Sequence, residues 1–298
     1  MRCVGFLCVM LAPFVVLCGC SSTGKVDLDK LGPPPSTQEL AERHNTWIAP
    51  LDTLWARVSV RAKGTYEDGE GYEEQGEGHL QIARPDRVSL SIGKLGETYF
   101  VFGASEESYW SFNLADSDRK VMLVGAMDRV TREKAAALGL PVHPSELIAL
   151  SGLAPIDLSS AGGTRWREDG KAVGIRVPGR WGSMVMWFDP EDAIVLRVQA
   201  YDGENELIAT AELSRYKDAE VPGARPVRVP GKVEITTPGD DGFVRIELSG
   251  PQRRDIRAMV FQPDRLRRAY RADEVIDLDA EFGSRDAANA QPTPEPVP

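Results

Sequence analysis

Apolar and polar residues alternate with a period of two along most of the chain, which is the pattern of strands that bury one face. In the first such run, the even-numbered residues from Leu54 to Ala62 are apolar and most odd-numbered ones are polar. Turn residues such as Asp169-Gly170 separate later runs at hairpin distances. We expect strands at residues 54–62, 78–83, 87–92, 98–104, 108–114, 120–124, 164–168, 172–177, 183–188, 193–201, 207–216, 228–236 and 243–249.

Three segments have helical features instead. The first begins with a capping box, in which Ser36 is the N-cap and Glu39 occupies the third helical position, and Pro50 limits its length. Two shorter helices are predicted at about residues 128–138 and 144–152. The chain lacks long alternating strand-helix-strand units, so the order of elements predicts a single α+β domain with helices on one side of an antiparallel sheet.

Composition and charge limit the class of protein. Hydrophobic residues make up 42% of the chain, which is enough for a sizeable core. The net charge of −10 makes nucleic acid a poor partner. The domain is expected to span residues 36–282, and residues 283–298, rich in Pro and Ala without apolar periodicity, are expected to be a disordered tail.

The first residues have the features of a lipoprotein signal peptide. A positive Arg2 precedes an apolar stretch from Val4 to Leu17, which at roughly 14 residues is shorter than the about 20 that a membrane-spanning helix needs. The stretch ends in Leu17-Cys18-Gly19-Cys20, a lipobox with an aliphatic residue three positions before the modified thiol. We therefore predict a signal peptide at residues 1–19, and Cys20 as the lipidated first residue of the processed chain.

The cysteine distribution favours this interpretation. All four cysteines lie in the first 20 residues, so a chain cleaved before Cys20 keeps one cysteine and can form no internal disulfide. Modification of Cys18 would place bulky Leu17 at the cleavage point, and a soluble secreted protein is the remaining alternative. Residues 20–35, polar and ending in three prolines, are expected to be a lipidated tether that links the body to membrane lipid.

Three local segments carry a resemblance to a known family. They are a Trp47 to Gly64 helix-to-strand passage, an Asp86 to Gly96 strand and loop, and a Leu138 to Pro155 stretch. Over about residues 37–180 the chain resembles the LolA and LolB lipoprotein-localisation family, and it is closest to the outer-membrane lipoprotein receptor LolB. It departs from the family's Pro-Leu-Gly loop, because Lys94 replaces the proline and the loop is one residue shorter.

The resemblance implies a fold, a ligand and a location. The fold would be an incomplete antiparallel β-barrel of about 11–13 strands covered by about three helices, with an apolar cavity for lipoprotein acyl chains. The partners implied are lipoprotein acyl chains and a soluble LolA-like carrier. The location implied is the periplasmic face of the outer membrane, and Ser21 after the lipidated cysteine permits export there under enterobacterial sorting.

Leu95 is the first candidate site residue. LolB-like proteins carry an exposed leucine in the loop after the third strand that helps to pass lipoprotein into the membrane, and Leu95 occupies the matching position. The alternative is an ordinary loop leucine that packs onto the body.

Two strands supply the candidates for an acyl pocket. Residues 99–102 and 184–188 are apolar on both alternating faces, so each strand is either covered on both sides or faces a core on one side and a ligand on the other. Methionine and aromatic side chains suit a pocket for flexible chains, although simple core packing is the alternative for each. The pocket candidates are Phe100, Phe102, Met184, Met186, Trp187 and Phe188.

Two charged segments have ordinary and functional interpretations. Seven arginines between Arg253 and Arg271 could meet lipid phosphates or an acidic partner, or form a solvated face that balances nearby acids. Six acidic residues between Glu67 and Glu77 are interpreted as a solvated hairpin loop, because their spacing matches no calcium loop.

The sequence predicts neither an enzyme nor a cofactor or metal site. The three histidines are scattered, and Ser151-Gly152 lacks the nucleophile-elbow pattern. Two functions remain: an anchored lipoprotein that binds acyl chains and accepts or inserts lipoproteins, or a structural or assembly lipoprotein that uses the half-barrel to bind a protein partner.

Overall fold

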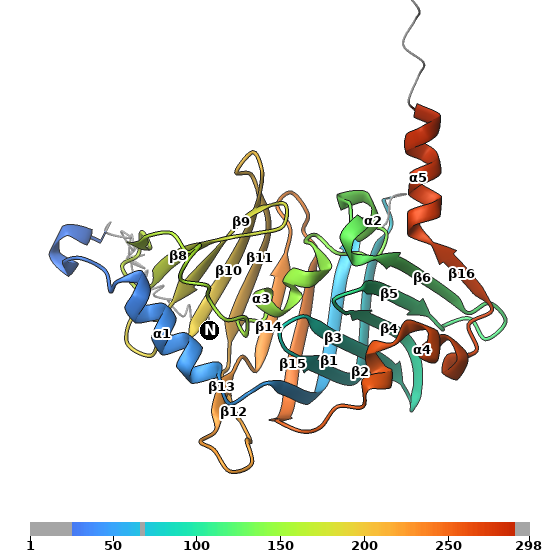
Figure 1. The fold of residues 1–298 in the computed structure, drawn as a ribbon, viewed down its shortest axis with the longest axis horizontal. Helices are drawn as coiled ribbons and strands as arrows, with labels where there is room; N and C mark the ends of the chain where they lie inside the picture. Colours follow the sequence, from blue (N-terminus) through green and yellow to red (C-terminus); the bar gives the residue numbers. More distant parts are fainter. Residues whose placement is uncertain (1–25, 66–68, 290–298) are drawn as a thin grey trace, which may run out of the picture.

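One large curved sheet forms most of the molecule (Figure 1). The computed structural model describes residues 26–65 and 69–289, with side chains through residue 283. The strands are β1 (Thr53–Thr65), β2 (Gly71–Ala83), β3 (Arg87–Lys94), β4 (Glu97–Ala104), β5 (Ser108–Asn113), β6 (Val121–Ala126), β7 (Thr164–Trp166), β8 (Val173–Pro178), β9 (Gly182–Phe188), β10 (Val195–Asp202), β11 (Leu207–Ser214), β12 (Lys217–Ala219), β13 (Val227–Val229), β14 (Lys232–Thr236), β15 (Phe243–Gln252) and β16 (Glu274–Asp277). The helices are α1 (Thr37–Ile48), α2 (Arg132–Ala136), α3 (Leu147–Leu150), α4 (Pro263–Tyr270) and α5 (Leu278–Asn289), with 3-10 turns η1 (Leu28–Leu31), η2 (Met127–Arg129), η3 (Pro144–Glu146) and η4 (Ala258–Phe261).

The sheet is antiparallel except at one edge. Its order is β16-β6-β5-β4-β3-β2-β1-β15-β14-β11-β10-β9-β8-β7, and only the short β16 runs parallel to its neighbour. Strands β16 and β7 remain the two edges, so within the described residues the sheet does not close. The predicted α+β class and the incomplete antiparallel barrel are therefore confirmed, with more strands than expected.

Helix α1 begins where the capping box predicts. The Glu39 backbone N–H donates to Ser36 Oγ at 3.2 Å, and the helix covers the β8–β11 half of the sheet (Figure 1). Two hydrogen bonds of 2.8 Å join the Asn45 side-chain amide to the backbone of Ile156. The helix is thus attached to the segment that leads into β7 as well as to the sheet.

The other two predicted helices are shorter than expected. Residues 128–138 form η2 and α2, and residues 144–152 form η3 and α3, each pair ending before a glycine with positive φ, Gly139 (74°) and Gly152 (71°). The strand expected at residues 228–236 is divided into β13 and β14 at Pro230, which has no backbone N–H for a ladder bond.

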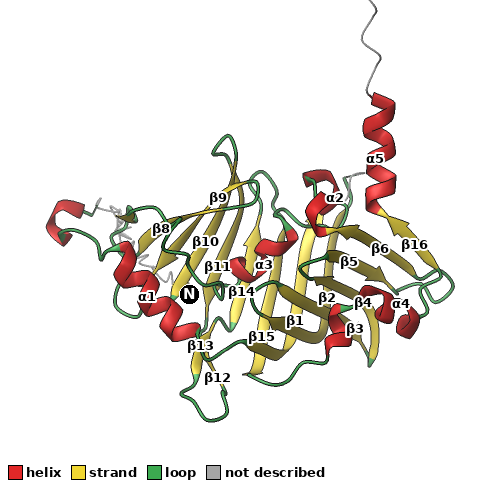
Figure 2. Ribbon diagram, viewed as in Figure 1, coloured by secondary structure: helices red, strands yellow, loops and turns green. Residues whose placement is uncertain are grey.

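The carboxy-terminal part is more regular than the sequence predicts. Residues 258–282 form η4, α4, β16 and the start of α5, none of which was expected. Helix α5 continues to Asn289, into the segment predicted to be disordered, and projects from the sheet end near β6 and β16 (Figure 2). The alanines at 287 and 288 favour helix and give this extension a local reason.

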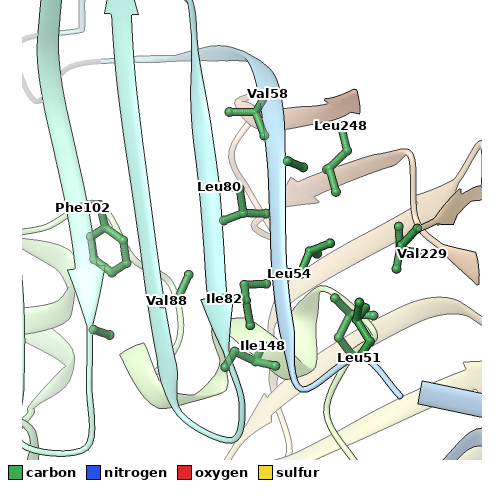
Figure 3. Packing of buried hydrophobic residues seen from close by; sticks show 14 of the residues in the cluster. Leu51, Leu54, Val58, Leu80, Ile82, Val88, Phe102, Ile148, Val229 and Leu248 are labelled. Atoms are coloured by element: carbon green, nitrogen blue, oxygen red, sulfur yellow. The ribbon is translucent and has the colours of Figure 1, made fainter. Parts of the chain in front are cut away.

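The core is divided between the two halves of the sheet. One cluster lies on the concave face of β1–β4 and includes Leu54, Ile82, Phe102 and Ile148 (Figure 3). A second fills the space between α1, α3 and strands β8–β11. A third lies on the outer face of β4–β6 under η4 and α4, where Leu266 is buried. Strands β4 to β6 are therefore covered on both faces.

Candidate functional site

The concave face of the sheet borders a cavity of about 640 Å³. This volume lies within the about 300–1,000 Å³ typical of small-molecule pockets. Strands β1 to β5, β14 and β15 supply most of the wall, while α3 and residues 137–141 cover it. Most of the lining side chains are aliphatic or aromatic, so the cavity suits a hydrocarbon ligand.

The cavity is closed at one end and open at the other. Leu54 and Ile82, at the closed end, are 1% and 2% exposed. Tyr99 and Ile246 are only half-buried, and Val244 is 37% exposed although it is apolar and lines the wall. Because β1–β2, β3–β4 and β14–β15 are antiparallel pairs consecutive in the chain, their hairpin turns lie at the same end of the sheet as these accessible residues.

A β-bulge shapes the open end. The register between β3 and β4 shifts just after Ile92, which pairs with Phe100, and this leaves Tyr99 as an extra residue. A bulge turns two successive side chains to one face, and both Tyr99 and Phe100 line the cavity. Gly76 of β2 makes room for this arrangement, because a Cβ at that position would overlap the Tyr99 hydroxyl.

Polar side chains gather at the same end. Tyr72 and Glu74 of β2, Tyr99, and Asn113 at the end of β5 all belong to the wall. Burial, together with the negative charge of Glu74, raises the pKa of Tyr99 above its usual value. The arrangement can hold an apolar chain inside and leave its polar head among hydroxyl, amide and carboxylate groups at the mouth.

The predicted pocket candidates are divided by the structure. Phe100 and Phe102 line the cavity. Met184, Met186 and Phe188 are not among its lining residues, because they pack in the second cluster under α1, where the His44 and Phe188 ring centroids are 5.4 Å apart. Trp187 lies on the opposite face of β9, with Val185, and its indole Nε1 donates to Gln199 Oε1 at 2.7 Å.

Other lining residues were not among the sequence-based candidates. Leu138, Leu140 and Leu147 come from the segment that covers the cavity. Their signal in the sequence is a leucine-rich stretch interrupted by Gly139 and Pro141, which is too short for a long helix and is not a strand. Glu74, expected in a solvated loop, lies instead on strand β2 and lines the wall.

The covering segment is attached to the carboxy-terminal helix. Lys134 Nζ of α2 donates to Asp279 Oδ1 at 2.6 Å and to the Arg129 carbonyl at 2.9 Å, and these lysine and aspartate side chains are only 8% and 14% exposed. Burial alone would raise the pKa of Asp279, but the hydrogen bonds from Lys134 and from the Ala126 backbone hold it below its usual value. This buried pair fixes α2 beside the cavity.

Leu95 forms the tip of the β3–β4 hairpin, at the open end of the sheet. Its side chain is 98% exposed, and its φ of 55° is followed by 90° at Gly96. Two successive positive φ values between the paired Lys94 and Glu97 are those of a type I′ turn, which normally carries Asn or Gly. A leucine there is unfavourable both for the backbone and for hydration of the side chain.

The predicted lipidation site lies outside the described residues. Cys20 belongs to residues 1–25, as does the predicted signal peptide. The last part of the predicted tether is described and lies along the β7 edge, where Trp166 Nε1 donates to the Gly32 carbonyl at 2.9 Å and Thr37 Oγ1 donates to the Gly162 carbonyl at 2.8 Å. Gly32 and the first residue of α1 are therefore held at the β7 end of the sheet.

The arginine-rich segment is partly paired. Arg253 forms a bidentate ion pair with Asp52 at 2.6 and 3.1 Å, and the Arg254 guanidinium lies 4.6 Å from the centre of the Trp55 ring. The other five arginines of the segment are exposed on or beside η4 and α4: Arg257, Arg265, Arg267, Arg268 and Arg271.

Among the described residues, no helix combines the length and the apolar character that crossing a membrane requires.

Comparisons with known proteins were made by sequence and by structure. No protein-family model and no curated protein sequence matches the chain. A LolA superfamily protein from Nitrosomonas europaea matches with a TM-score of 0.50 and 12% identity over 77% of this chain and 99% of its own. A DUF1329 family protein from Desulfovibrio piger has a TM-score of 0.53 and 12% identity over 75% and 95%.

An outer membrane lipoprotein-sorting protein domain from Vibrio parahaemolyticus is also similar, with a TM-score of 0.50 and 13% identity over 76% of this chain and 94% of its own. These identities are low, and the agreement extends over nearly the whole length of each solved structure. The chain has the LolA-like fold, an open antiparallel sheet that carries a few helices.

Proposed function

We propose that this chain is a lipid-anchored protein that binds acyl chains and accepts or inserts lipoproteins at the periplasmic face of the outer membrane. The observation that carries the proposal is the apolar cavity of about 640 Å³, which opens at one end of the curved sheet. Transfer of an acyl chain of about 15 methylenes out of water is worth on the order of 10 kcal/mol, so such a protein needs a matching cavity and no catalytic group.

Three further features support the proposal. The sequence around Cys20 predicts lipidation, and residues 20–35 supply a tether to the membrane. Leu95 presents an apolar tip at the open end of the sheet. The local segments that resemble LolB, together with the LolA-like fold, favour a role in lipoprotein localisation with a soluble LolA-like carrier as donor.

The proposal is tested by measuring bound lipid in the unsubstituted chain and in a variant whose cavity is blocked by a larger side chain. The chain from Ser21 onward keeps every residue of the four buried clusters, and we expect it to co-purify with acyl lipid detectable by mass spectrometry. Ala62→Trp should abolish this lipid, because Ala62 is half-buried in the wall near the open end. Lys63→Trp is the matched control, since the next residue of β1 faces the other side of the sheet and is exposed.

The alternative function gives the opposite result. If the half-barrel only binds a protein partner, neither variant changes an acyl ligand, because none is bound. Absence of any bound or competable acyl ligand in the unsubstituted chain would overturn the carrier proposal.

A further inference from the structure

The wall of the cavity carries negative charge without positive charge. Glu74 is the one charged side chain in the wall as residues 26–65 and 69–289 define it, and that wall includes neither lysine nor arginine. The remaining polar groups near the mouth are the hydroxyls of Tyr72 and Tyr99 and the amide of Asn113. A ligand head at the mouth therefore meets one negative charge and several neutral hydrogen-bonding groups.

The position of Glu74 follows from the register of β2. Glu74 pairs with Ala62 of β1 and lies two residues from Gly76, so all three are on the concave face. Tyr99 lies over Gly76, which is two residues from Glu74 on the same face of β2, so the tyrosine and the carboxylate are neighbours at the mouth. The carboxylate thus stands at the open end, beside the bulge that directs Tyr99 inward.

In the described part of the chain, no ion pair holds the Glu74 carboxylate. Glu73, the preceding residue on the outer face, forms a 2.6 Å ion pair with Arg61. None of the ion pairs among residues 26–65 and 69–283 includes Glu74. The field of this carboxylate therefore acts on whatever occupies the mouth.

From this asymmetry, and resting on the proposed function, we propose that the open end selects acyl ligands by the charge of their polar head. Neutral and cationic heads are accepted, and anionic heads such as carboxylate, sulfate or phosphate are disfavoured. Neutral ester and amide carbonyls can accept hydrogen bonds from the Tyr99 hydroxyl and the Asn113 amide. The ligand class that fits is an acyl glyceride or an acylated peptide terminus without a phosphate.

The size of the effect follows from Coulomb's law. Two unit charges about 5 Å apart in a water-like medium change affinity about fourfold, so a cationic and an anionic head should differ on the order of 10-fold. Added salt should reduce the ratio, since the mouth is open to solvent.

Three single-chain probes of equal length test the proposal. Affinities of hexadecyltrimethylammonium, hexadecanoylglycerol and hexadecyl sulfate are measured below their micelle concentrations at low salt, by displacement of a neutral fluorescent probe. We expect the cation to bind on the order of 10-fold more tightly than the anion. Glu74→Gln should remove most of this ratio, because it removes the carboxylate charge from the wall.

Glu77→Gln is the matched control. Glu77 is exposed on the same strand and the substitution removes the same charge, but its side chain points to the outer face. Equal affinities for cation and anion, or a ratio that Glu77→Gln lowers as much as Glu74→Gln, would overturn the head selection and leave acyl binding intact. Failure of hexadecanoylglycerol to bind would instead overturn the proposed function itself.

Discussion

Leu95 offers a substitution for which stability and function should change in opposite directions. Its φ of 55° places a bulky L-residue in the left-handed region, and its side chain is 98% exposed. Asparagine suits this position of the hairpin turn, because it tolerates a left-handed backbone better than leucine does. A leucine at this position thus lowers stability without contributing to the packed core.

The magnitude follows from those two values. Left-handed backbone costs an L-residue about 1–2 kcal/mol, and asparagine recovers part of this by local hydrogen bonding. Leu95→Asn removes almost no buried apolar surface, because the leucine side chain is exposed, so we expect the free energy of unfolding to rise by about 0.5–1 kcal/mol. Full burial of a leucine side chain in an apolar phase is worth about 1.5–3 kcal/mol, so binding of the hairpin tip to a membrane should weaken by about 10- to 100-fold.

The assay combines two measurements on the same variant. Urea denaturation gives the free energy of unfolding, and vesicle flotation of the unlipidated chain gives membrane binding, with acyl-probe affinity as the internal control. Leu95→Gly is a second variant that removes the backbone strain, because glycine has no Cβ and adopts positive φ readily. If Leu95→Asn lowers stability, the leucine packs onto the body in solution and this reasoning is refuted; unchanged vesicle binding would refute the membrane contact.

Two further predictions concern titratable groups that hold the covering segments. Burial, and to a lesser extent the charge of Arg180, lowers the pKa of His143 from 6.5 to about 4, so the unfolded chain binds this proton more tightly than the folded chain. The free energy of unfolding should therefore fall as the pH decreases from about 6.5 to about 4. His143→Gln should flatten that part of the pH profile, as measured by urea denaturation. Asp279→Ala should lower the free energy of unfolding by about 3–5 kcal/mol, because it leaves Lys134, 8% exposed, as an unpaired buried charge. A loss below about 1 kcal/mol in denaturant titration would mean that Lys134 reaches water when its partner is removed.

The sequence predicted the site only where the pattern decides the face of a strand. Phe100 and Phe102 alternate toward the concave side of β4, and the structure places both in the wall. Met186 and Phe188 have an equally apolar pattern on β9, but they pack in a buried cluster with residues of α1, which covers that half of the sheet. An apolar pattern indicates that a face of the strand is shielded from water. It does not show whether a helix or a ligand shields that face.

Long-range contacts decided the features that local patterns could not show. The inward turn of Tyr99 depends on a bulge in the pairing of β3 with β4, and on a glycine in β2 that makes room for it. The position of α2 depends on an ion pair between residues 145 apart in the chain. Neither leaves a periodic signal, because each partner by itself is an ordinary surface residue type.

By itself, the sequence determined the period-two strands and the start of α1 at its capping box, because each depends on residues close together along the chain. The anchoring signal that ends at Cys20 stays a prediction of the same local kind. Only the tertiary structure decided that the sheet stays open, that one half is filled by α1, and that the other half keeps a cavity with Glu74 at its mouth. Those outcomes depend on which part of the concave face is covered by segments that are distant along the chain. A helix and a ligand can each shield the same apolar surface from water.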